Sequence, residues 1–404
     1  MDFAHDQTTE ELRRALASFA REFADPRADL VEAQLAAQDD PWAWDTVPAF
    51  LELKQEARRR GLWNLFLPGG RGAGLTNLQY APLAEITGYA SHVVPAALNC
   101  AAPDTGNMEV LAMFGTDAQQ EQWLRPLLDG QIRSAFAMTE PDVASSDAAN
   151  IATSIRRVGD EYVINGRKWW ITGAMNPNAK VFIVMGKSDP DADRHRQQSM
   201  ILVPRHTPGV VVKRPMKVFG YDDHDHGGHA ELEFREVRVP AENLIGQEGE
   251  GFAIAQARLG PGRIHHCMRS IGVAERAIEL MCGRAAGRVA FGKPLADQGV
   301  IRDWIATSRV QLEQLRLLAL KTAWLMDTVG NKGAHTEIQA IKIATPATVQ
   351  WILDKAIQVH GAGGLSQDFR LAADYARIRT LRLADGPDEV HKNALARAEF
   401  RSHA

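Results

Sequence analysis

The sequence is poor in cysteine, has no long apolar run and carries charges that nearly cancel. Three cysteines (Cys100, Cys267 and Cys282) lie far apart in 404 residues, which excludes a disulfide framework and favours free thiols in a reducing compartment. No stretch approaches the ~18 consecutive apolar residues that a membrane-spanning helix needs. The opening residues show neither a basic leader nor an apolar signal segment. We therefore expect a cytoplasmic protein without a membrane span.

Several common ligand-binding motifs are also missing. A formal net charge of −4 gives no general attraction to nucleic acid, so an anionic ligand must be met by local arginines. The glycine-rich segment 69–74 is followed by no Lys-Ser/Thr pair, which argues against a phosphate-binding loop. Segment 222–229 is rich in aspartate and histidine, but its spacing matches no zinc motif. We interpret it as a loop between strands and predict no metal.

The apolar residues that are present change their period twice along the chain. Hydrophobic residues make up 45% and charged residues 24% of the sequence, as in ordinary globular proteins, and the length exceeds that of one hydrophobic core. Residues 8–130 show helical periodicity. From 131 to 239 the period is two, with Gly, Asp and Pro between short apolar runs, which favours a small β-barrel or sandwich.

The last part of the chain is helical again. Helices are expected at about 252–290, 299–329, 336–359 and 369–400, which is the pattern of a four-helix bundle. The sequence thus predicts an α+β multidomain protein. Its parts are an N-terminal helical domain (1–130), a middle β-barrel or sandwich domain (131–245) and a C-terminal four-helix bundle (246–404).

One polar loop begins where helical sequence gives way to strand-like sequence. Arg133–Phe136 reads as a short strand, and Pro141 and a cluster of small polar residues follow it. Such a loop can hold a flat, polar-edged cofactor ring with backbone N–H groups and hydroxyls, although a polar surface turn is the alternative. Farther on, Asn165-Gly166 predicts a hairpin turn before the segment Lys168-Trp169-Trp170-Ile171-Thr172. Paired tryptophans serve more often as core than as a cofactor shelf.

Together the two stretches resemble the flavin-contacting signature of the acyl-CoA dehydrogenase family: Met-Thr-Glu-Pro, a Gly/Ser-rich turn with Asp, then Trp-Ile-Thr. The resemblance covers nearly the whole chain and implies FAD between a middle β domain and a C-terminal bundle. The implied FAD-binding residues here are Phe136, Met138, Thr139, Ser145, Ser146, Trp170 and Thr172, with Ser146 also at the substrate. The loop departs from the family, because one extra residue separates Glu140 from Asp147, and Asp142 and Ser145 replace common glycines. We expect it to be shaped differently over the flavin.

The candidate catalytic base lies in the stretch 382–391. It resembles a Glu-Gly-Thr turn whose glutamate removes the substrate α-proton, and matching places Asp385, Gly386 and Pro387 at these positions. A carboxylate against apolar walls has its pKa raised toward that of a useful base. Aspartate is one methylene shorter, so helix and substrate must sit about 1.5 Å closer. The alternative is an N-cap role for Asp385 in the last helix. The resemblance also implies Gly386 at the substrate and Pro387 and Glu389 at the cofactor.

A second helix carries the base in some relatives, just before a bundle arginine. That position here is Gly262, which has no side chain, so the rival base is missing. By the same resemblance Arg263 and His266 line the substrate site. A bundle salt bridge for Arg263, and a core or cleft-lining place for the His265-His266 pair, are the alternatives.

Two further segments match cofactor-contacting segments of the family. Arg288-Val289-Ala290-Phe291-Gly292-Lys293-Pro294 resembles an Arg-x-x-Phe-Gly-Lys-Pro segment that reaches the FAD of a neighbouring subunit, and an arginine fork suits a pyrophosphate. The segment from Gln358 through Gly361 and Gly363 resembles the family's cofactor turn, and Gln298 is a further candidate. The resemblance therefore implies a homo-oligomer, either a dimer or a tetramer.

The resemblance implies an FAD-dependent acyl-CoA dehydrogenase of fatty acid metabolism. Asp385 would take the α-proton while the β-hydrogen leaves as hydride to flavin N5, and an electron-transfer flavoprotein would accept the electrons. The alternatives are an oxidase or monooxygenase of the same fold, such as an acyl-CoA or nitroalkane oxidase, or a non-catalytic flavin-bound assembly protein. The wording of 259–266 and 382–391 is most similar to a subgroup found as the C-terminal part of kinase-like fusion proteins. Its substrates tend toward long, branched or 4-oxygenated acyl chains.

Overall fold

The structure, a computed structural model, describes residues 5–404 apart from the side chains at 259–261. The expectation drawn from the first four residues and the part of the subgroup wording carried by Leu259, Gly260 and Pro261 lie outside the described residues. The observed order of elements is helical, then β, then helical, as the periodicity predicts.

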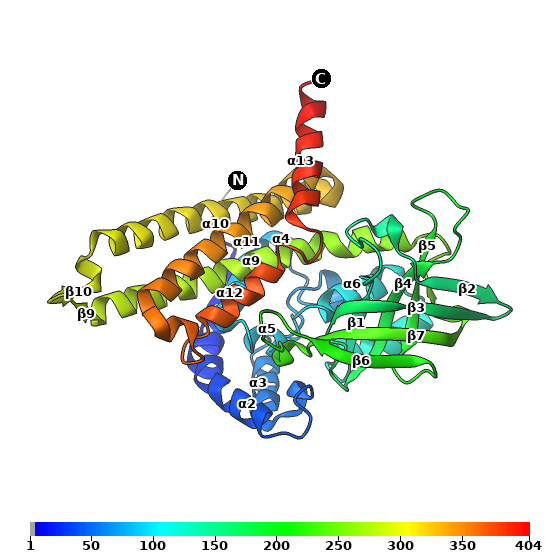
Figure 1. The fold of residues 1–404 in the computed structure, drawn as a ribbon, viewed down its shortest axis with the longest axis horizontal. Helices are drawn as coiled ribbons and strands as arrows, with labels where there is room; N and C mark the ends of the chain where they lie inside the picture. The colour runs from blue at the N-terminus through cyan, green and yellow to red at the C-terminus, as the bar shows by residue number, and fades with distance from the viewer. Residues whose placement is uncertain (1–4) are drawn as a thin grey trace. The chain divides into compact units, whose positions relative to one another are not determined.

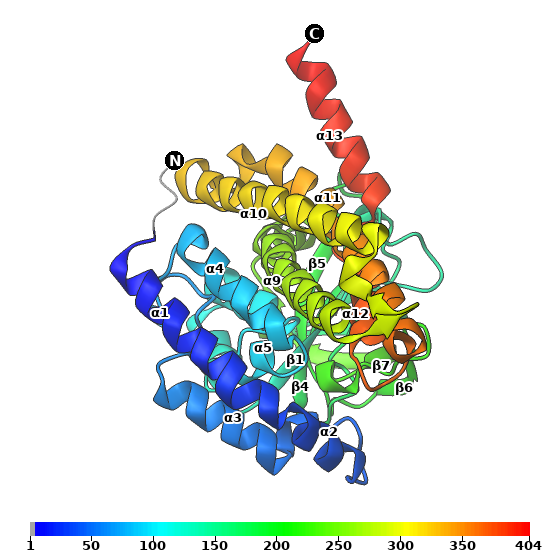
Figure 2. The ribbon, with the colours of Figure 1, turned by 90° about the vertical axis from the view of Figure 1, so that its left-hand side faces the viewer.

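Helices fill the chain up to residue 128. They are α1 (Gln7–Ser18), α2 (Ala28–Ala36), α3 (Pro48–Arg59), α4 (Asn77–Thr87), α5 (Val94–Ala97), α6 (Asp104–Phe114), α7 (Asp117–Gln119) and α8 (Arg125–Leu128). Capping residues begin several of them. The Asp6 carboxylate accepts from Thr9 N at the start of α1, and Thr76 and Gln79 form a capping box at the start of α4. Helices α1 and α4 lie side by side (Figure 2).

The middle of the chain forms one eight-stranded mixed sheet. Its strands are β1 (Arg133–Ala137), β2 (Ser154–Val158), β3 (Glu161–Thr172), β4 (Ala179–Lys187), β5 (Gln198–Pro204), β6 (Val210–Met216), β7 (His229–Pro240) and β8 (Leu244–Ile245). They follow the order β6-β7-β3-β2-β4-β5-β8, and β1 lies parallel beside β4 (Figure 1). Strand β4 is buried over seven of its nine residues, since it lies inside the sheet, and it reads as a continuous apolar run. The core over the sheet includes Tyr162, Phe182, Leu232 and Phe234.

The hairpin turn predicted at Asn165-Gly166 is wrong. Both residues lie inside β3, where the pairing with β7 shifts between Ile164 and Gly166. The turn between β2 and β3 falls instead at residues 159–160. Glycine is needed at 166 for a different reason, because a Cβ there would lie 2.3 Å from the Thr153 hydroxyl oxygen. A bulge with close backbone approach therefore uses the same residue pair that a tight turn prefers.

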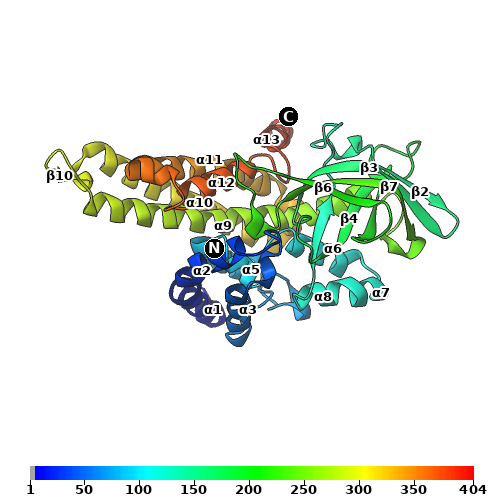
Figure 3. The same ribbon diagram turned by 60° about the horizontal axis from the view of Figure 1, so that its bottom comes forward.

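The C-terminal part contains long helices joined by short turns. They are α9 (Gly251–Gly287), α10 (Gly299–Gly333), α11 (His335–His360), α12 (Leu371–Thr380) and α13 (Asp388–Ser402), with a small hairpin of β9 (Val289–Ala290) and β10 (Lys293–Pro294). Helix α11 lies beside α10 and α12 (Figures 1 and 3). The single helix expected over 369–400 is wrong, because residues 381–387 interrupt it with a turn. That turn carries the candidate base.

The chain divides into two compact units that do not follow the three predicted domains. The first unit contains residues up to Pro26, 68–95 and 263–404, and the second contains 27–67 and 96–262. Helix α9 belongs to the second unit up to Gly262 and to the first from Arg263 onward. Among the described residues, no helix combines the length and apolar character needed to cross a membrane. The three-domain division stays a prediction.

Candidate active site

The candidate base lies on a strained turn of the first unit, between α12 and α13. Asp385 has φ of 55° and Gly386 has φ of 104°. A non-glycine residue in the left-handed region costs about 1–3 kcal/mol and is kept mostly where a side chain must be aimed. Gly386 is required here, since a Cβ would lie 2.9 Å from the His391 imidazole. The N-cap of α13 is Pro387, so the alternative of Asp385 as the N-cap is wrong.

Two cations, the partly buried Arg263 and the buried Lys342, hold this turn by its backbone. Arg263 Nε on α9 donates to the Asp385 carbonyl oxygen at 3.0 Å. Lys342 Nζ on α11 donates to the carbonyl oxygens of Leu381 and Gly386. Lys342 is only 1% exposed, and burial lowers its pKa and that of Arg263. The cations thus fix the path of the turn through its carbonyl oxygens.

The Asp385 carboxylate faces the imidazole of His266. His266 Nε2 lies 3.7 Å from Asp385 Oδ2, and the two side chains are 24% and 18% exposed. A partly open carboxylate beside an imidazole can accept a proton from a bound molecule. The structure therefore brings Asp385, Gly386, Arg263 and His266 together. That they contact a substrate stays a prediction.

The neighbouring histidine, His265, points the other way. Its ring packs edge-on against Tyr80, with centroids 4.9 Å apart, and burial lowers its pKa to about 3. His265 is therefore a neutral core residue. The core position that was the alternative for the pair thus holds for His265, and the substrate-lining role of His266 stays a prediction.

Sequence reasoning missed two residues that pack against the base turn, Lys342 on α11 and His391 on α13. Lys342 lies in the apolar run Ala340-Ile341-Lys342-Ile343-Ala344, and a charge inside such a run was the available signal. His391 follows the turn on α13, and its Nδ1 contacts the Gln339 carbonyl oxygen Oε1. Burial, followed by the charges of Arg263 and Lys342, lowers the pKa of His391 to about 4. His391 is thus neutral and packs the turn from the inside.

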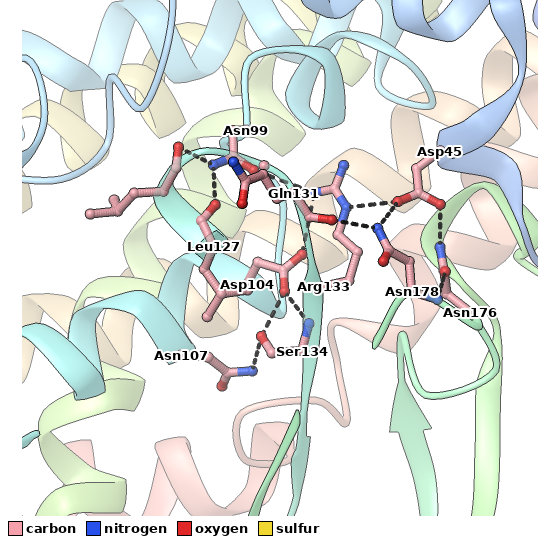
Figure 4. A network of polar contacts seen from close by, with 12 residues as sticks. Asp45, Asn99, Asp104, Asn107, Leu127, Gln131, Arg133, Ser134, Asn176 and Asn178 are labelled. Carbon is pink, nitrogen blue, oxygen red and sulfur yellow. Dashed lines mark hydrogen bonds and ion pairs between the residues drawn. The ribbon is translucent and has the colours of Figure 1, made fainter. Parts of the chain in front are cut away.

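The candidate flavin loop belongs to the second unit, and a buried network anchors the strand that leads into it (Figure 4). Arg133 at the start of β1 lies 3.5 Å from Asp45 and 3.3 Å from Asp104. The Asp104 carboxylate also accepts from Ser134 N at 2.7 Å. Burial raises the pKa of Asp104, although Arg133 opposes this. The network fixes the position of β1, and hence of Phe136 within the strand and of Met138 directly after it.

The carboxylate of Glu140 in this loop is buried and binds groups inside the protein. It accepts from Ala152 N at 2.8 Å and Thr153 N at 2.9 Å, and it pairs with Lys168 at 2.7 Å. Burial opposes its ionisation, but the Lys168 charge and these hydrogen bonds bring the pKa of Glu140 below its ordinary value. Burial lowers the pKa of Lys168 to about 8. The pair is therefore structural.

The longer loop after Glu140 is closed by its own side chains. The Ser145 hydroxyl accepts from Glu140 N at 2.8 Å. Asp147 accepts from Ala149 N at 3.1 Å and pairs with Arg194 at 2.7 Å. Ser145, which replaces a common glycine, holds the loop in shape.

The end of β3 presents an aromatic surface beside this loop. Trp169 N donates to the Thr139 carbonyl oxygen at 3.0 Å, which ties strand and loop together. Trp170 has φ of 53° and is 39% exposed. Thr172 follows, with its hydroxyl 3.0 Å from His229 Nδ1. Phe136 lies under the Arg258 guanidinium, 4.2 Å from ring centroid to Cζ. The exposed Trp170 indole, beside backbone held by the Trp169–Thr139 hydrogen bond, could pack against a flat cofactor ring.

The other predicted cofactor residues lie at the far end of the first unit's helices. Phe291 at the tip of the β9–β10 hairpin is fully exposed (100%) with φ of 52°, and Arg288 precedes the hairpin. Gln358, Gly361 and Gly363 lie at the C-terminal end of α11 and in the turn after it. Gln358 comes sixteen residues after Lys342, so about 24 Å of helix separates this turn from the base turn. A single flavin ring bound at the base turn therefore cannot contact the turn after α11 as well.

Residues 222–228 form a loop that leads into β7, and two of its carboxylates each pair with one imidazole. His229 Nε2 lies 3.0 Å from Asp223, and His226 Nδ1 lies 3.3 Å from Asp225. In residues 5–404, no group of three or more His, Cys, Asp or Glu side chains is arranged to hold a metal ion.

Comparison with known families matches almost the whole chain. Family models for the N-terminal, middle and C-terminal domains of acyl-CoA dehydrogenase match residues 6–131, 135–237 and 249–400. The chain is 56% identical to the probable acyl-CoA dehydrogenase FadE2 of Mycobacterium tuberculosis over 99% of its own length and 97% of that protein. It is 51% identical to acyl-CoA dehydrogenase family member 11 of Rattus norvegicus, of which it spans about half (52%), over 100% of its own length.

Two solved structures show how far the likeness extends in three dimensions. A putative acyl-CoA dehydrogenase from Mycobacterium abscessus is 50% identical with a TM-score of 0.96, and the match covers 100% of both chains. Butyryl-CoA dehydrogenase from Megasphaera elsdenii is 25% identical with a TM-score of 0.82, over 99% of this chain and 100% of that one.

Proposed function

The chain belongs to the acyl-CoA dehydrogenase family, and on that premise we propose that it oxidises an acyl-CoA thioester to the 2-enoyl-CoA. The observation that carries this proposal is the base turn, where strained Asp385 lies beside Arg263 and His266. A carboxylate aimed by strain, next to cationic groups that bind its backbone, suits the removal of an α-proton.

Asp385 is the proposed base. Arg263 and Lys342 fix the turn through carbonyl oxygens, and His391 packs behind Gly386. The carboxylate therefore keeps one position relative to the substrate, as proton transfer over hydrogen-bond distance requires. Gly262 offers no second base. His266 and Gly386 line the path of the thioester.

FAD is the proposed cofactor, and the loop and the end of β3 fit a flat, polar-edged ring. The residues of the second unit that would hold it are Phe136, Met138, Thr139, Ser145, Ser146, Trp170 and Thr172. When bound, FAD supplies the acceptor for the β-hydrogen, taken as hydride at N5. The Glu140–Lys168 pair holds the loop so that its N–H groups and hydroxyls keep a fixed direction.

We also propose a homo-oligomer in which the hairpin and glycine turn of one subunit serve the cofactor of another. Two observations support this. About 24 Å of α11 separates Gln358 from Lys342, and Phe291 at the hairpin tip is fully exposed (100%). Arg288, Gln298, Gly361 and Gly363 would act from this second site. Whether the assembly is a dimer or a tetramer is decided by light scattering.

The proposed substrates are the long, branched or 4-oxygenated acyl-CoAs of the kinase-fusion subgroup. The support is the 51% identity to acyl-CoA dehydrogenase family member 11 and the subgroup-like wording around Asp385. The proposed electron acceptor is an electron-transfer flavoprotein, and the proposed location is the cytoplasm.

An anaerobic titration of the purified protein with a panel of acyl-CoAs tests the function. We expect the bound flavin to bleach with at least one long or branched acyl-CoA and 2-enoyl-CoA to form in equal amount. A flavin that bleaches with no acyl-CoA would leave the non-catalytic alternative standing. Dioxygen consumption during aerobic turnover would instead identify an oxidase.

A further inference from the structure

Three side chains of the second unit form a continuous hydrogen-bonded chain that the proposed catalytic steps do not use. Thr172 at the end of β3 and His229 at the start of β7 are directly paired across the two strands. The Thr172 hydroxyl oxygen lies 3.0 Å from His229 Nδ1. His229 Nε2 lies 3.0 Å from Asp223 Oδ2, and these two side chains are only 13% and 11% exposed.

The loop before β7 is built to bring Asp223 to this place. Asp223 itself has φ of 48°, and Gly227 and Gly228 have φ of 73° and 61°. Gly228 N donates to the Asp223 carbonyl oxygen at 3.0 Å, and Gly173 N donates to the Gly228 carbonyl oxygen at 2.8 Å. A Cβ at Gly228 would lie 2.4 Å from the Trp42 ring. Three of the six residues 223–228 thus have left-handed backbone, and this shape places the Asp223 carboxylate beside His229.

The direction of each hydrogen bond follows from the groups themselves. A carboxylate only accepts, so an imidazole that carries a single ring proton holds it on Nε2, toward Asp223. Nδ1 then carries a lone pair and accepts the Thr172 hydroxyl hydrogen. The Thr172 oxygen keeps its own lone pairs for a ligand. Thr172 therefore acts toward that ligand as an acceptor, although a free threonine can also donate.

We propose that Asp223 and His229 fix Thr172 as a hydrogen-bond acceptor toward the bound flavin and so favour the reduced ring. The inference rests on the proposed FAD site, in which Thr172 contacts the ring. N5 of an oxidised isoalloxazine is an acceptor, whereas the reduced ring carries a hydrogen there. A protein acceptor that faces N5 matches only the reduced form, and the hydrogen bond that it accepts there shifts the equilibrium toward the reduced ring. His229 and Asp223 are positioning residues that act through Thr172.

The midpoint potential of the bound FAD, measured by equilibration with a reference dye, tests this. In His229→Phe the Thr172 hydroxyl is free to donate to the oxidised ring. We expect the reduced-to-oxidised ratio at fixed potential to fall about tenfold, which is about 30 mV for a two-electron couple. Thr172→Ser should retain the wild-type potential, and Thr172→Val should lower it. In the Thr172→Val background, His229→Phe should cause no further change.

His224→Phe is the matched control, because it makes the same change in the same loop outside the hydrogen-bonded chain. An unchanged or higher potential in His229→Phe, or an equal shift in His224→Phe, would overturn the inference. If His229→Phe does not retain FAD, Asp223→Ala is measured instead, and we expect a shift in the same direction because the imidazole tautomer is no longer held. A wild-type protein that binds no FAD would reject the proposed function, whereas unaltered potentials in flavin-loaded variants would reject only this inference.

Discussion

The candidate flavin loop of the second unit and the base turn of the first unit each contain a carboxylate near a buried lysine, and they use it in opposite ways. In the flavin loop, Lys168 and two backbone N–H groups bind the side chain of Glu140. In the base turn, Lys342 and Arg263 bind backbone carbonyl oxygens around Asp385. The Glu140 carboxylate is engaged inside the fold, whereas the Asp385 carboxylate stays partly open and is the proposed base. The role of a buried acid therefore depends on whether nearby cations contact its carboxylate or its backbone.

Replacing Asp385 with Asn should have the largest effect, a loss of flavin reduction without a loss of folding. The amide cannot take a proton, and general-base catalysis contributes about 10²- to 10⁴-fold. We expect a folded, yellow protein whose flavin bleaches at least 100-fold more slowly under anaerobic stopped flow. Asp385→Glu, which retains the carboxylate, is the control and should keep measurable reduction. Wild-type bleaching in Asp385→Asn would refute the base assignment.

Glu140→Gln, unlike Asp385→Asn, should mainly lower the free energy of unfolding. The amide leaves the buried Lys168 charge without its partner, which costs about 3–5 kcal/mol. Urea unfolding measures this. The control is Glu161→Gln, since Glu161 pairs with Arg238 at 3.2 Å in a half-exposed bridge and should lose less than about 1 kcal/mol. Equal losses in both variants would show that Glu140 is not a buried structural group.

Lys342→Met should sharpen the comparison by loosening the base turn without touching the carboxylate. Leu381 and Gly386 lose the donor to their carbonyl oxygens, and displacement of a base by about 1 Å costs up to about 100-fold in rate. We expect flavin reduction to slow about 10- to 100-fold while FAD affinity stays unchanged. Lys332→Met, a change at an exposed position on α10, is the control. A loss of FAD binding with normal reduction would place Lys342 in the cofactor site instead.

His265→Phe should give the smallest effect at neutral pH. Burial lowers the pKa of His265 from 6.5 to about 3, so between these values the unfolded chain binds a proton that the folded protein excludes. Stability therefore falls as the pH drops, by at most about 1.4 kcal/mol per pH unit from this group. Phenylalanine preserves the ring contact with Tyr80 and removes the titration. Urea midpoints from pH 7 to pH 4 should fall less steeply than in the wild type.

Periodicity was sufficient to predict the helix-β-helix order, whereas the assignment of the stretch 382–391 as the base segment stays a prediction. Such predictions depend on residues that are close in the chain. The spacing of apolar residues indicates which face of an element is buried, and the sequence Asp385-Gly386-Pro387 favours a local backbone conformation. The same local rules predicted a hairpin at Asn165-Gly166 and one helix over 369–400. Both predictions failed because a packed neighbour decided the conformation. Thr153 imposes the glycine in β3, and Lys342 on α11 captures the carbonyl oxygens of the turn.

What the sequence by itself determined is which elements form and which segment carries the acid. Only the tertiary structure decided what each polar group contacts. Lys342 lies 39 and 44 residues before Leu381 and Gly386, whose carbonyl oxygens it binds. His391 lies 52 residues beyond Gln339, and His229 lies 57 residues beyond Thr172. No local pattern encodes such pairings. Burial makes these pairings matter, since a charge removed from water must find its partner wherever the fold places it.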